Sequence, residues 1–117
     1  MQLDHVNIKT DDLEGTTAFY RDVIGLKIGP RPNFPFPGVW LYHETRPVVH
    51  LKSPGAPGAG STAPLDHVAF STEDLDRVVA ALDAKKLDYT LRALPDGSLR
   101  QCFVRDPNGI MVEITGV

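Results

Sequence analysis

Leu3-Asp-His-Val6 and Leu65-Asp-His-Val68 are the same four residues, repeated 62 positions apart in a chain of 117 residues. The likeness continues downstream, where Ile8 and Phe70 are both large and apolar. A repeat at a fixed offset is the sequence signature of a duplicated structural unit. The stretch therefore predicts two copies of one small unit, each with a histidine near the start of its first strand. Further identities at the same offset pair Thr10 with Thr72, Asp12 with Asp74 and Leu13 with Leu75.

The size of the chain suits one compact domain or two half-domains that share an interface. Each half has about 55 to 60 residues, which is marginal for a separate hydrophobic core. We therefore expect the halves to bury surface against each other, within one chain or between two. Hydrophobic residues make up 42% of the chain and charged residues 23%, as in ordinary soluble globular proteins.

The charge pattern and the composition exclude several classes of partner. The formal net charge is −3 and no basic stripe is present, so we expect no nucleic-acid partner. No run of 18 apolar residues occurs, which argues against a membrane partner, and no signal peptide is recognisable. The single cysteine, Cys102, cannot form a disulfide within the chain, which favours a reducing cytoplasm. We expect a cytoplasmic protein.

The first unit reads as strand, helix and three further strands. Alternation over 2–9 predicts a strand, and apolar residues at helical spacing predict a helix over 12–24, capped by Thr10 or Asp11. Gly25 is the expected left-handed terminator. The remaining strands are expected at 26–31, 39–42 and 48–52, with a proline-rich loop at 30–37 between the first two.

The second unit repeats that order after a linker at 53–63, which contains only Ser, Pro, Gly, Ala and Thr. Ser71 or Thr72 is expected to cap a helix that runs to about Lys86. Asp106-Pro-Asn-Gly109 predicts a hairpin turn before the last strand. The expected strands are 65–71, 87–94, 99–105 and 110–115, so the fold class is α+β.

Both units end on an apolar strand that a possible metal ligand interrupts. His50 lies between Val49 and Leu51, and Glu113 lies between Val112 and Ile114. Since side chains alternate across a strand, each polar group faces away from its apolar neighbours. If the helices pack on the apolar faces, the polar groups share the opposite, concave face. The repeat then gives a four-residue metal site of His5, His50, His67 and Glu113.

Three imidazoles and a carboxylate suit one divalent transition metal ion, Zn, Ni, Co, Fe or Mn, rather than Ca or Mg. A lone inward-facing histidine on a strand is more often a core residue with satisfied hydrogen bonds. Glu113 is harder to explain in that way, because unpaired buried carboxylates are rare. Four such groups at positions related by the repeat favour the metal site.

Side chains around the proline-rich loop are candidates for binding a substrate. Phe34, Phe36 and Trp40 could line an apolar pocket, although Trp40 equally suits the core. Arg100 could hold an anionic group of the substrate, and so could Arg31 and Lys52. For each of these three cations, a solvated surface role is the competing interpretation.

Several motifs resemble those of the vicinal oxygen chelate superfamily, whose members include glyoxalase I, bleomycin resistance proteins and extradiol dioxygenases. The resemblance implies two tandem βαβββ modules in a cup-shaped mixed sheet, as one domain with modules at 1–52 and 64–117. It also implies a homodimer, with the cups at or near the subunit interface. The matching segments are Leu3-Asp-His-Val6 with Asp12-Leu13, Phe19-Tyr-Arg-Asp-Val-Ile-Gly-Leu26, Leu65-Asp-His-Val68, Phe103-Val-Arg-Asp-Pro-Asn-Gly109 and Val112-Glu-Ile114.

In glyoxalase-like members of the superfamily, the metal ligands fall on the positions of His5, His50, His67 and Glu113. This chain departs from glyoxalase I at His50, where an acidic residue is common, so Glu113 would be the only base. The first hypothesis is a metal-dependent lyase or isomerase that chelates a small substrate through neighbouring oxygens. The second is an extradiol-type dioxygenase with non-haem iron, and the third is a non-catalytic protein that binds or sequesters a small molecule.

Overall fold

The computed structural model describes residues 2–55 and 67–117, which belong to two compact units, Met1–Ala59 and Gly60–Val117. Each unit contains one four-stranded mixed sheet and a helical segment, in the order strand, helix and three strands. The predicted α+β class and the βαβββ repeat are therefore confirmed. Most of the predicted linker, 56–63, lies outside the described residues, so its prediction stays untested.

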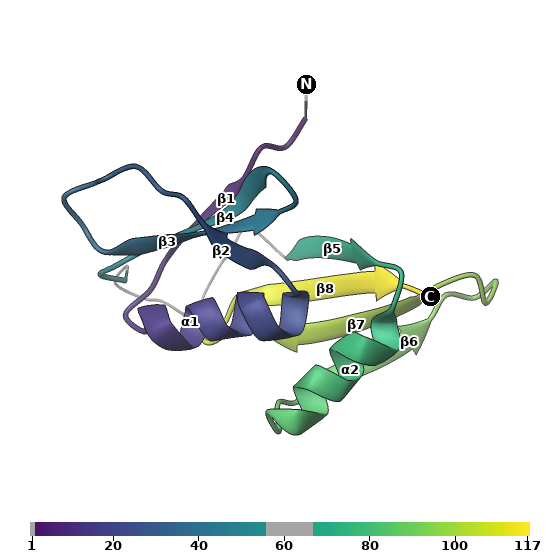
Figure 1. Cartoon of the computed structure of the whole chain (residues 1–117). Helices are drawn as coiled ribbons and strands as arrows, with labels where there is room; N and C mark the ends of the chain where they lie inside the picture. The colour runs from purple at the N-terminus through teal and green to yellow at the C-terminus, as the bar shows by residue number, and fades with distance from the viewer. Residues whose placement is uncertain (1, 56–66) are drawn as a thin grey trace. The chain divides into compact units, whose positions relative to one another are not determined.

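The first unit follows the predicted order of elements (Figure 1). The sheet order is β1-β4-β3-β2, in which β1 is parallel to β4 and the other pairs are antiparallel. The helical segment α1 contacts β3 and β4, so it covers one face of the sheet. Its elements are β1 (Val6–Lys9), α1 (Leu13–Phe19), η1 (Tyr20–Ile24), β2 (Lys27–Gly29), β3 (Gly38–His43) and β4 (Arg46–Lys52).

The start of α1 corrects the predicted cap. The carboxylate of Asp12 accepts a hydrogen bond from the Gly15 backbone N–H at 2.9 Å, so Asp12 caps the helix. Thr10 is instead buried, and its hydroxyl bonds that of Thr16 at 2.9 Å. The last five residues of the predicted helix form a turn of π-helix, η1. This turn ends at Gly25, which has a φ of +87°. The predicted left-handed terminator is confirmed.

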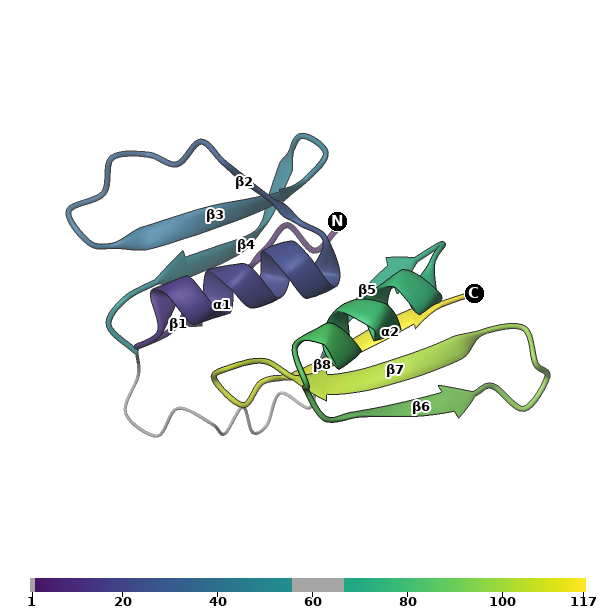
Figure 2. The same ribbon diagram turned by 60° about the horizontal axis from the view of Figure 1, so that its bottom comes forward.

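The second unit repeats the first with the sheet order β5-β8-β7-β6, in which only the β5–β8 pair is parallel. Helix α2 contacts β7 and β8 and lies along one face of their sheet (Figure 2). Asp74 caps it by accepting from the Arg77 N–H at 3.0 Å, in place of the predicted Ser71 or Thr72. The elements are β5 (Val68–Thr72), α2 (Leu75–Ala84), β6 (Tyr89–Ala93), β7 (Arg100–Arg105) and β8 (Met111–Gly116).

The predicted hairpin turn at 106–109 joins β7 to β8. Asp106 is 5% exposed, and its carboxylate accepts from the backbone N–H groups of Asn108 and Ile110 at 2.8 and 2.9 Å. Gly109 has a φ of +84°, which glycine adopts without steric cost. The turn fixes the register of the hairpin, so that Phe103 lies opposite Glu113.

The cores lie on the helix-covered faces of the sheets, as the alternation predicted. Val49 and Leu51 of β4 are fully or almost fully buried, and so are Val112 and Ile114 of β8. Their polar neighbours His50 and Glu113 therefore project from the opposite faces. Among the residues that the structure describes, no helix is long and apolar enough to cross a membrane.

Candidate functional site

Glu113 is the centre of a polar cluster on the face of the second sheet that α2 does not cover. Its Oε1 accepts hydrogen bonds from Gln101 Nε2 at 2.7 Å and from Thr115 Oγ1 at 2.6 Å. Its Oε2 lies 3.0 Å from His67 Nε2. Glu113 is only 8% exposed. Burial of a charged group costs free energy unless the group has polar partners, and these contacts provide them.

Gln101 and Thr115 are site residues that the sequence analysis missed, although the sequence contains a signal for both. Thr115 follows Glu113 by two residues, so it shares the same face of β8. Gln101 pairs with Thr115 across the β7–β8 ladder. The Asp106-Pro-Asn-Gly109 turn sets that register, and counting back from it would have placed Gln101 diagonally beside Glu113.

The contact between His67 and Glu113 is compatible with a shared metal ion. Two ligand atoms at right angles, each about 2.1 Å from a metal, lie about 3.0 Å apart. The observed separation of 3.0 Å between Nε2 and Oε2 matches that spacing. An imidazole and a carboxylate are also a suitable donor pair for a divalent transition metal. This pair fits the metal that the sequence analysis predicted.

His5 and His50 form a different arrangement in the first unit. Their rings stack at 3.9 Å with an interplanar angle of 11°, and the His50 ring stacks in the same way on Trp40. The stack follows from register, because Trp40 of β3 lies opposite His50 of β4. Asp4 Oδ2 lies 2.7 Å from His5 Nδ1, a contact that orients the ring and directs Nε2 away from Asp4.

The ring of His50 is held by two contacts. Its Nε2 lies 3.0 Å from the Pro47 carbonyl oxygen, to which it can donate a hydrogen bond. Burial lowers the pKa of His50, and the neighbouring charge of His5 lowers it further. Both effects favour the neutral form of the imidazole, and the hydrogen bond to Pro47 acts in the opposite direction. An imidazole binds a metal in the plane of its ring, so two parallel rings cannot share one ion until one of them turns.

The structure thus brings the four predicted ligands together as two pairs, His5 with His50 and His67 with Glu113. Across 2–55 and 67–117, no group of three or more His, Cys, Asp or Glu side chains could hold a metal ion in the conformation described. The four-ligand site therefore stays a prediction.

Comparison with known proteins identifies the family. The model of the Glyoxalase/Bleomycin resistance protein/Dioxygenase superfamily matches residues 2–114. The chain belongs to this superfamily. The lactoylglutathione lyase of Agrobacterium tumefaciens shares the fold, with 22% identity and a TM-score of 0.70 over 98% of this chain and 92% of that one. The predicted superfamily is therefore confirmed.

Two relatives match almost the whole superfamily domain. The ethylmalonyl-CoA/methylmalonyl-CoA epimerase of Cereibacter sphaeroides is 30% identical to this chain. The alignment is 135 positions long and covers 99% of this chain and 98% of the relative. Protein YaeR of Escherichia coli (strain K12) is 29% identical over 97% of this chain and 94% of its own. Members of the superfamily, such as this epimerase and the lactoylglutathione lyase, are often enzymes that act on small molecules.

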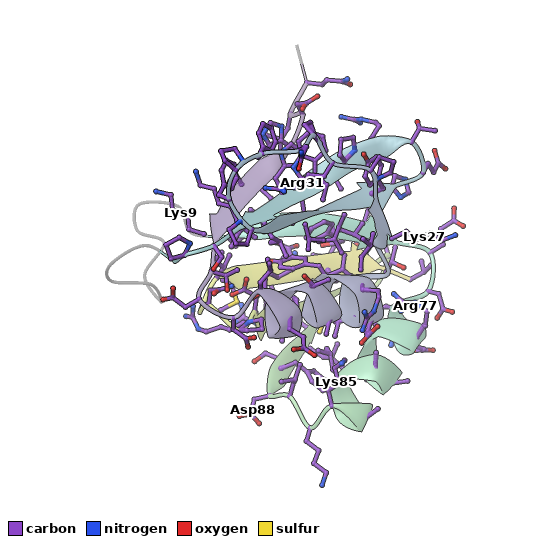
Figure 3. All side chains as sticks on the ribbon, turned by 60° about the vertical axis from the view of Figure 1, so that its left-hand side comes forward. Lys9, Lys27, Arg31, Arg77, Lys85 and Asp88 are labelled. Carbon is purple, nitrogen blue, oxygen red and sulfur yellow. The ribbon has the colours of Figure 1, made fainter. Side chains whose placement is uncertain are left out.

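The aromatic residues predicted to bind substrate lie close together in this superfamily member. Phe34 and Phe36 stack at 5.2 Å, and Phe34 lies 6.4 Å from Trp40 between ring centroids. The guanidinium of Arg31, labelled in Figure 3, lies 5.1 Å from both phenylalanine rings. The two phenylalanines are 40% and 37% exposed. They form a surface cluster rather than a core, and their role toward a substrate stays a prediction.

Arg100 lies on the other face of the second sheet. In β7 it shares a face with the buried Cys102 and Val104, which is the face that α2 covers. Its guanidinium pairs with Asp76 of α2 at 2.9 Å. The alternation of the strand thus directs Arg100 away from Glu113. This geometry separates Arg100 from Glu113, so its role toward a substrate stays a prediction that the proposals below do not use.

A hollow of about 240 Å³ lies on the same face of the sheet as Glu113. The strand register places Phe103 opposite Glu113 and Thr90 opposite Phe103, so Phe103 lies between Glu113 and the β6 side of the hollow. The sequence analysis did not identify it. It is lined by Thr90, Arg92, Phe103, Arg105 and Met111.

Proposed function

We propose that this protein is a metal-dependent enzyme of the glyoxalase-like type, which moves a proton at a carbon next to a carbonyl group. The observation that carries the proposal is the buried Glu113 carboxylate, held at one oxygen and facing His67 with the other. A buried charge costs free energy unless it is partnered, and such sites are concentrated where chemistry is done. This arrangement supports a lyase or isomerase reaction.

The metal ligands in this proposal are His5, His50, His67 and Glu113, and the ion is one of Zn, Ni, Co, Fe or Mn. When bound, the metal would supply a Lewis acid that polarises the substrate carbonyl and favours loss of the neighbouring proton. His67 and Glu113 already have the spacing of two ligands of one ion. For His50 to join them, its ring has to leave the Pro47 carbonyl and the stack with His5.

Glu113 is the proposed proton carrier. Gln101 and Thr115 both donate to Oε1, so Oε2 is the oxygen that can take up the proton, and it would have to leave the ion to do so. The C–H bond of the substrate breaks, its electron pair moves toward the carbonyl oxygen, and the proton goes to Oε2. Return of the proton to the adjacent carbon, together with transfer of the hydroxyl proton to the former carbonyl oxygen, isomerises an α-hydroxycarbonyl substrate. Delivery of a proton to the opposite face of the same carbon by a second proton donor, while the first proton stays on Glu113, epimerises the substrate. Both outcomes begin with the same step.

The relative at 30% identity favours epimerisation as a second candidate within this chemistry. An epimerase also removes a proton next to a carbonyl, here the thioester of an acyl-CoA. The two candidates therefore differ in the substrate and not in the role of Glu113. Separate assays on hemithioacetals and on 2-substituted malonyl-CoA thioesters decide between them.

The test is metal analysis of protein purified without added metal, followed by assays of the Ni, Co and Zn forms. We expect about one ion per chain and turnover of an α-hydroxycarbonyl or thioester substrate. Glu113→Gln should lower kcat by about a hundredfold or more, since it removes the proton acceptor. The matched control is Glu73→Gln at the exposed surface before α2, which should leave kcat unchanged.

Other outcomes would favour the remaining hypotheses. Iron retained through purification, together with oxygen uptake on catechols, would replace this proposal by an extradiol-type dioxygenase. A bound small molecule that survives unchanged, with an affinity unaltered by Glu113→Ala, would indicate a non-catalytic binding or resistance protein. Inactivity of all metal forms on both substrate classes would contradict the proposal directly.

A further inference from the structure

We propose that the hollow beside Glu113 binds an anionic group of the substrate, a phosphate or a carboxylate, through Arg92 and Arg105. This inference rests on the proposed function, because it treats the hollow as part of the same site. The inference adds the class of substrate, which is an apolar or carbonyl-bearing molecule that carries a negatively charged group. The hollow measures about 240 Å³ and is lined by both arginines, with Thr90, Phe103 and Met111.

The strand register decides which face these residues occupy. Thr90, Phe103 and Glu113 form one row across β6, β7 and β8. Arg105 pairs with Met111 on one side of that row, and Arg92 pairs with Gln101 on the other. All of these side chains therefore project from the face that carries Glu113, which is the face opposite α2.

The spacing of the rows lets the two arginines reach one group. With strands about 4.8 Å apart and residues about 3.4 Å apart along each strand, the Cα atoms of Arg92 and Arg105 are about 14 Å apart. An arginine side chain extends about 6 to 7 Å, so the two guanidinium groups can meet above Phe103 once Arg105 leaves the Gly109 carbonyl that it bonds in this structure. By the same spacing, the Cα of Arg105 lies about 8 Å and that of Arg92 about 12 Å from the Cα of Glu113.

The contacts of the two guanidinium groups point to an anion. Arg92 holds its guanidinium carbon 5.5 Å from the centroid of the Phe103 ring, so a planar donor group lies over the floor of the hollow. The Nη1 atom of Arg105 donates a hydrogen bond to the Gly109 carbonyl at 2.8 Å, which anchors this side chain next to the hairpin turn. A guanidinium has five N–H donors, so both arginines keep donors for a ligand. Both side chains are exposed.

The floor of the hollow determines what kind of anion fits. Phe103 and Met111 are half-buried and apolar. Phe103 lies between the two arginines, and Met111 lies opposite Arg105. A bare inorganic ion would leave this floor uncovered. A group such as an aryl or acyl phosphate or carboxylate would place its apolar part on Phe103 and its charge on the arginines, where bidentate hydrogen bonds are strongest.

The test is binding of phenyl phosphate, benzoate and benzyl alcohol to the full chain in EDTA, measured by isothermal titration calorimetry. We expect at least one of the two anions to bind and the neutral alcohol not to bind. Tighter binding of phenyl phosphate assigns a phosphate, and tighter binding of benzoate assigns a carboxylate. Arg92→Ala should weaken the preferred anion about tenfold or more, as expected for loss of hydrogen bonds to a charged group.

Arg100→Ala is the matched control, because it removes the same charge from the opposite face of the same sheet. Its affinity for the anion should equal that of the wild type. Arg105→Lys is the second variant at the hollow: it keeps the charge but loses the bidentate geometry, and it should bind more weakly than the wild type. It avoids a full loss of the side chain that supports the turn at Gly109.

Two results would overturn this inference: absence of anion binding by the wild type, or equal weakening by Arg92→Ala and Arg100→Ala, which would indicate a general charge effect. Neither result depends on turnover, because the titration is done without metal. Anion binding in a protein that turns over no substrate would leave this inference standing and remove the proposed function. Turnover of a neutral α-hydroxycarbonyl without anion binding would do the reverse.

Discussion

At the scale of single residues, Glu113 depends on two neighbours that carry no charge. Gln101 and Thr115 both donate to Oε1, which leaves Oε2 directed toward His67. Neither donor lies in the repeated motif, and yet they fix the orientation of the proposed base. A carboxylate that is 8% exposed loses most of its hydration, so these two hydrogen bonds replace water.

Gln101→Leu should therefore destabilise the protein. The substitution keeps the size of the side chain but leaves Glu113 with one donor fewer at Oε1. We expect the free energy of unfolding to fall by about 1.5 to 3 kcal/mol, the range for a hydrogen bond to a charged group. Urea denaturation measures it, with Asn7→Leu, which removes an exposed amide from β1, as the control. An unchanged urea midpoint in Gln101→Leu would show that the contact does not contribute.

The inward position of Glu113 could be predicted from the sequence, since Val112 and Ile114 flank it in an alternating strand. The position of Arg100 could have been predicted by the same rule, because it shares the parity of the apolar Cys102 and Val104. Its charge alone suggested an anion site, and the parity argues against one. The stacked rings of His5, His50 and Trp40 depend on side-chain rotamers, which a sequence pattern does not specify.

At the scale of elements, the hairpin of β7 and β8 sets the geometry of the site. Its register brings Phe103 opposite Glu113 and Arg105 opposite Met111. A shift by one residue would move each side chain of one strand to the other face. The turn at 106–109 therefore controls both the polar cluster and the hollow. Asp106 holds that turn through two backbone N–H groups.

Asp106→Ala should lower the free energy of unfolding by about 1 to 3 kcal/mol, because the part-buried N–H groups of Asn108 and Ile110 lose their acceptor. The control is Asp96→Ala in the turn between β6 and β7. There an exposed carboxylate accepts from the N–H and the hydroxyl of Ser98, and water can replace it. We expect a smaller loss in this control. Thermal unfolding compares the two variants, and equal shifts in Tm would contradict the assigned role of burial.

Some features of the helices could be predicted from the sequence and others could not. Both apolar stripes and the stop at Gly25 could be predicted from periodicity and from the need for a left-handed residue. The capping residues could not be predicted, because several Ser, Thr and Asp residues precede each helix and only one of them accepts a hydrogen bond from a free N–H group of the first turn. Asp12 and Asp74 occupy equivalent places in the repeat and perform the same function.

At the scale of the whole molecule, the duplication gives two units with the same strand order. A unit of this size buries only about 60% of the surface of its unfolded chain. Large apolar side chains remain exposed in both, such as Ile28 in β2 at 53% and Leu91 in β6 at 43%. Both strands are at the edge of their sheet. These exposed groups support the proposal of a homodimer.

Light scattering coupled to size-exclusion chromatography tests that proposal. A homodimer should have twice the 12.8 kDa mass of one chain at micromolar concentration, because association removes apolar surface from water. Ile28→Lys and Leu91→Lys each place a charge at one sheet edge. We expect the variant whose edge lies in the interface to run as a monomer and the other to remain a dimer, which makes each variant the control for the other. A wild-type mass of 12.8 kDa at all concentrations would contradict the homodimer and require each cup to be built from one chain.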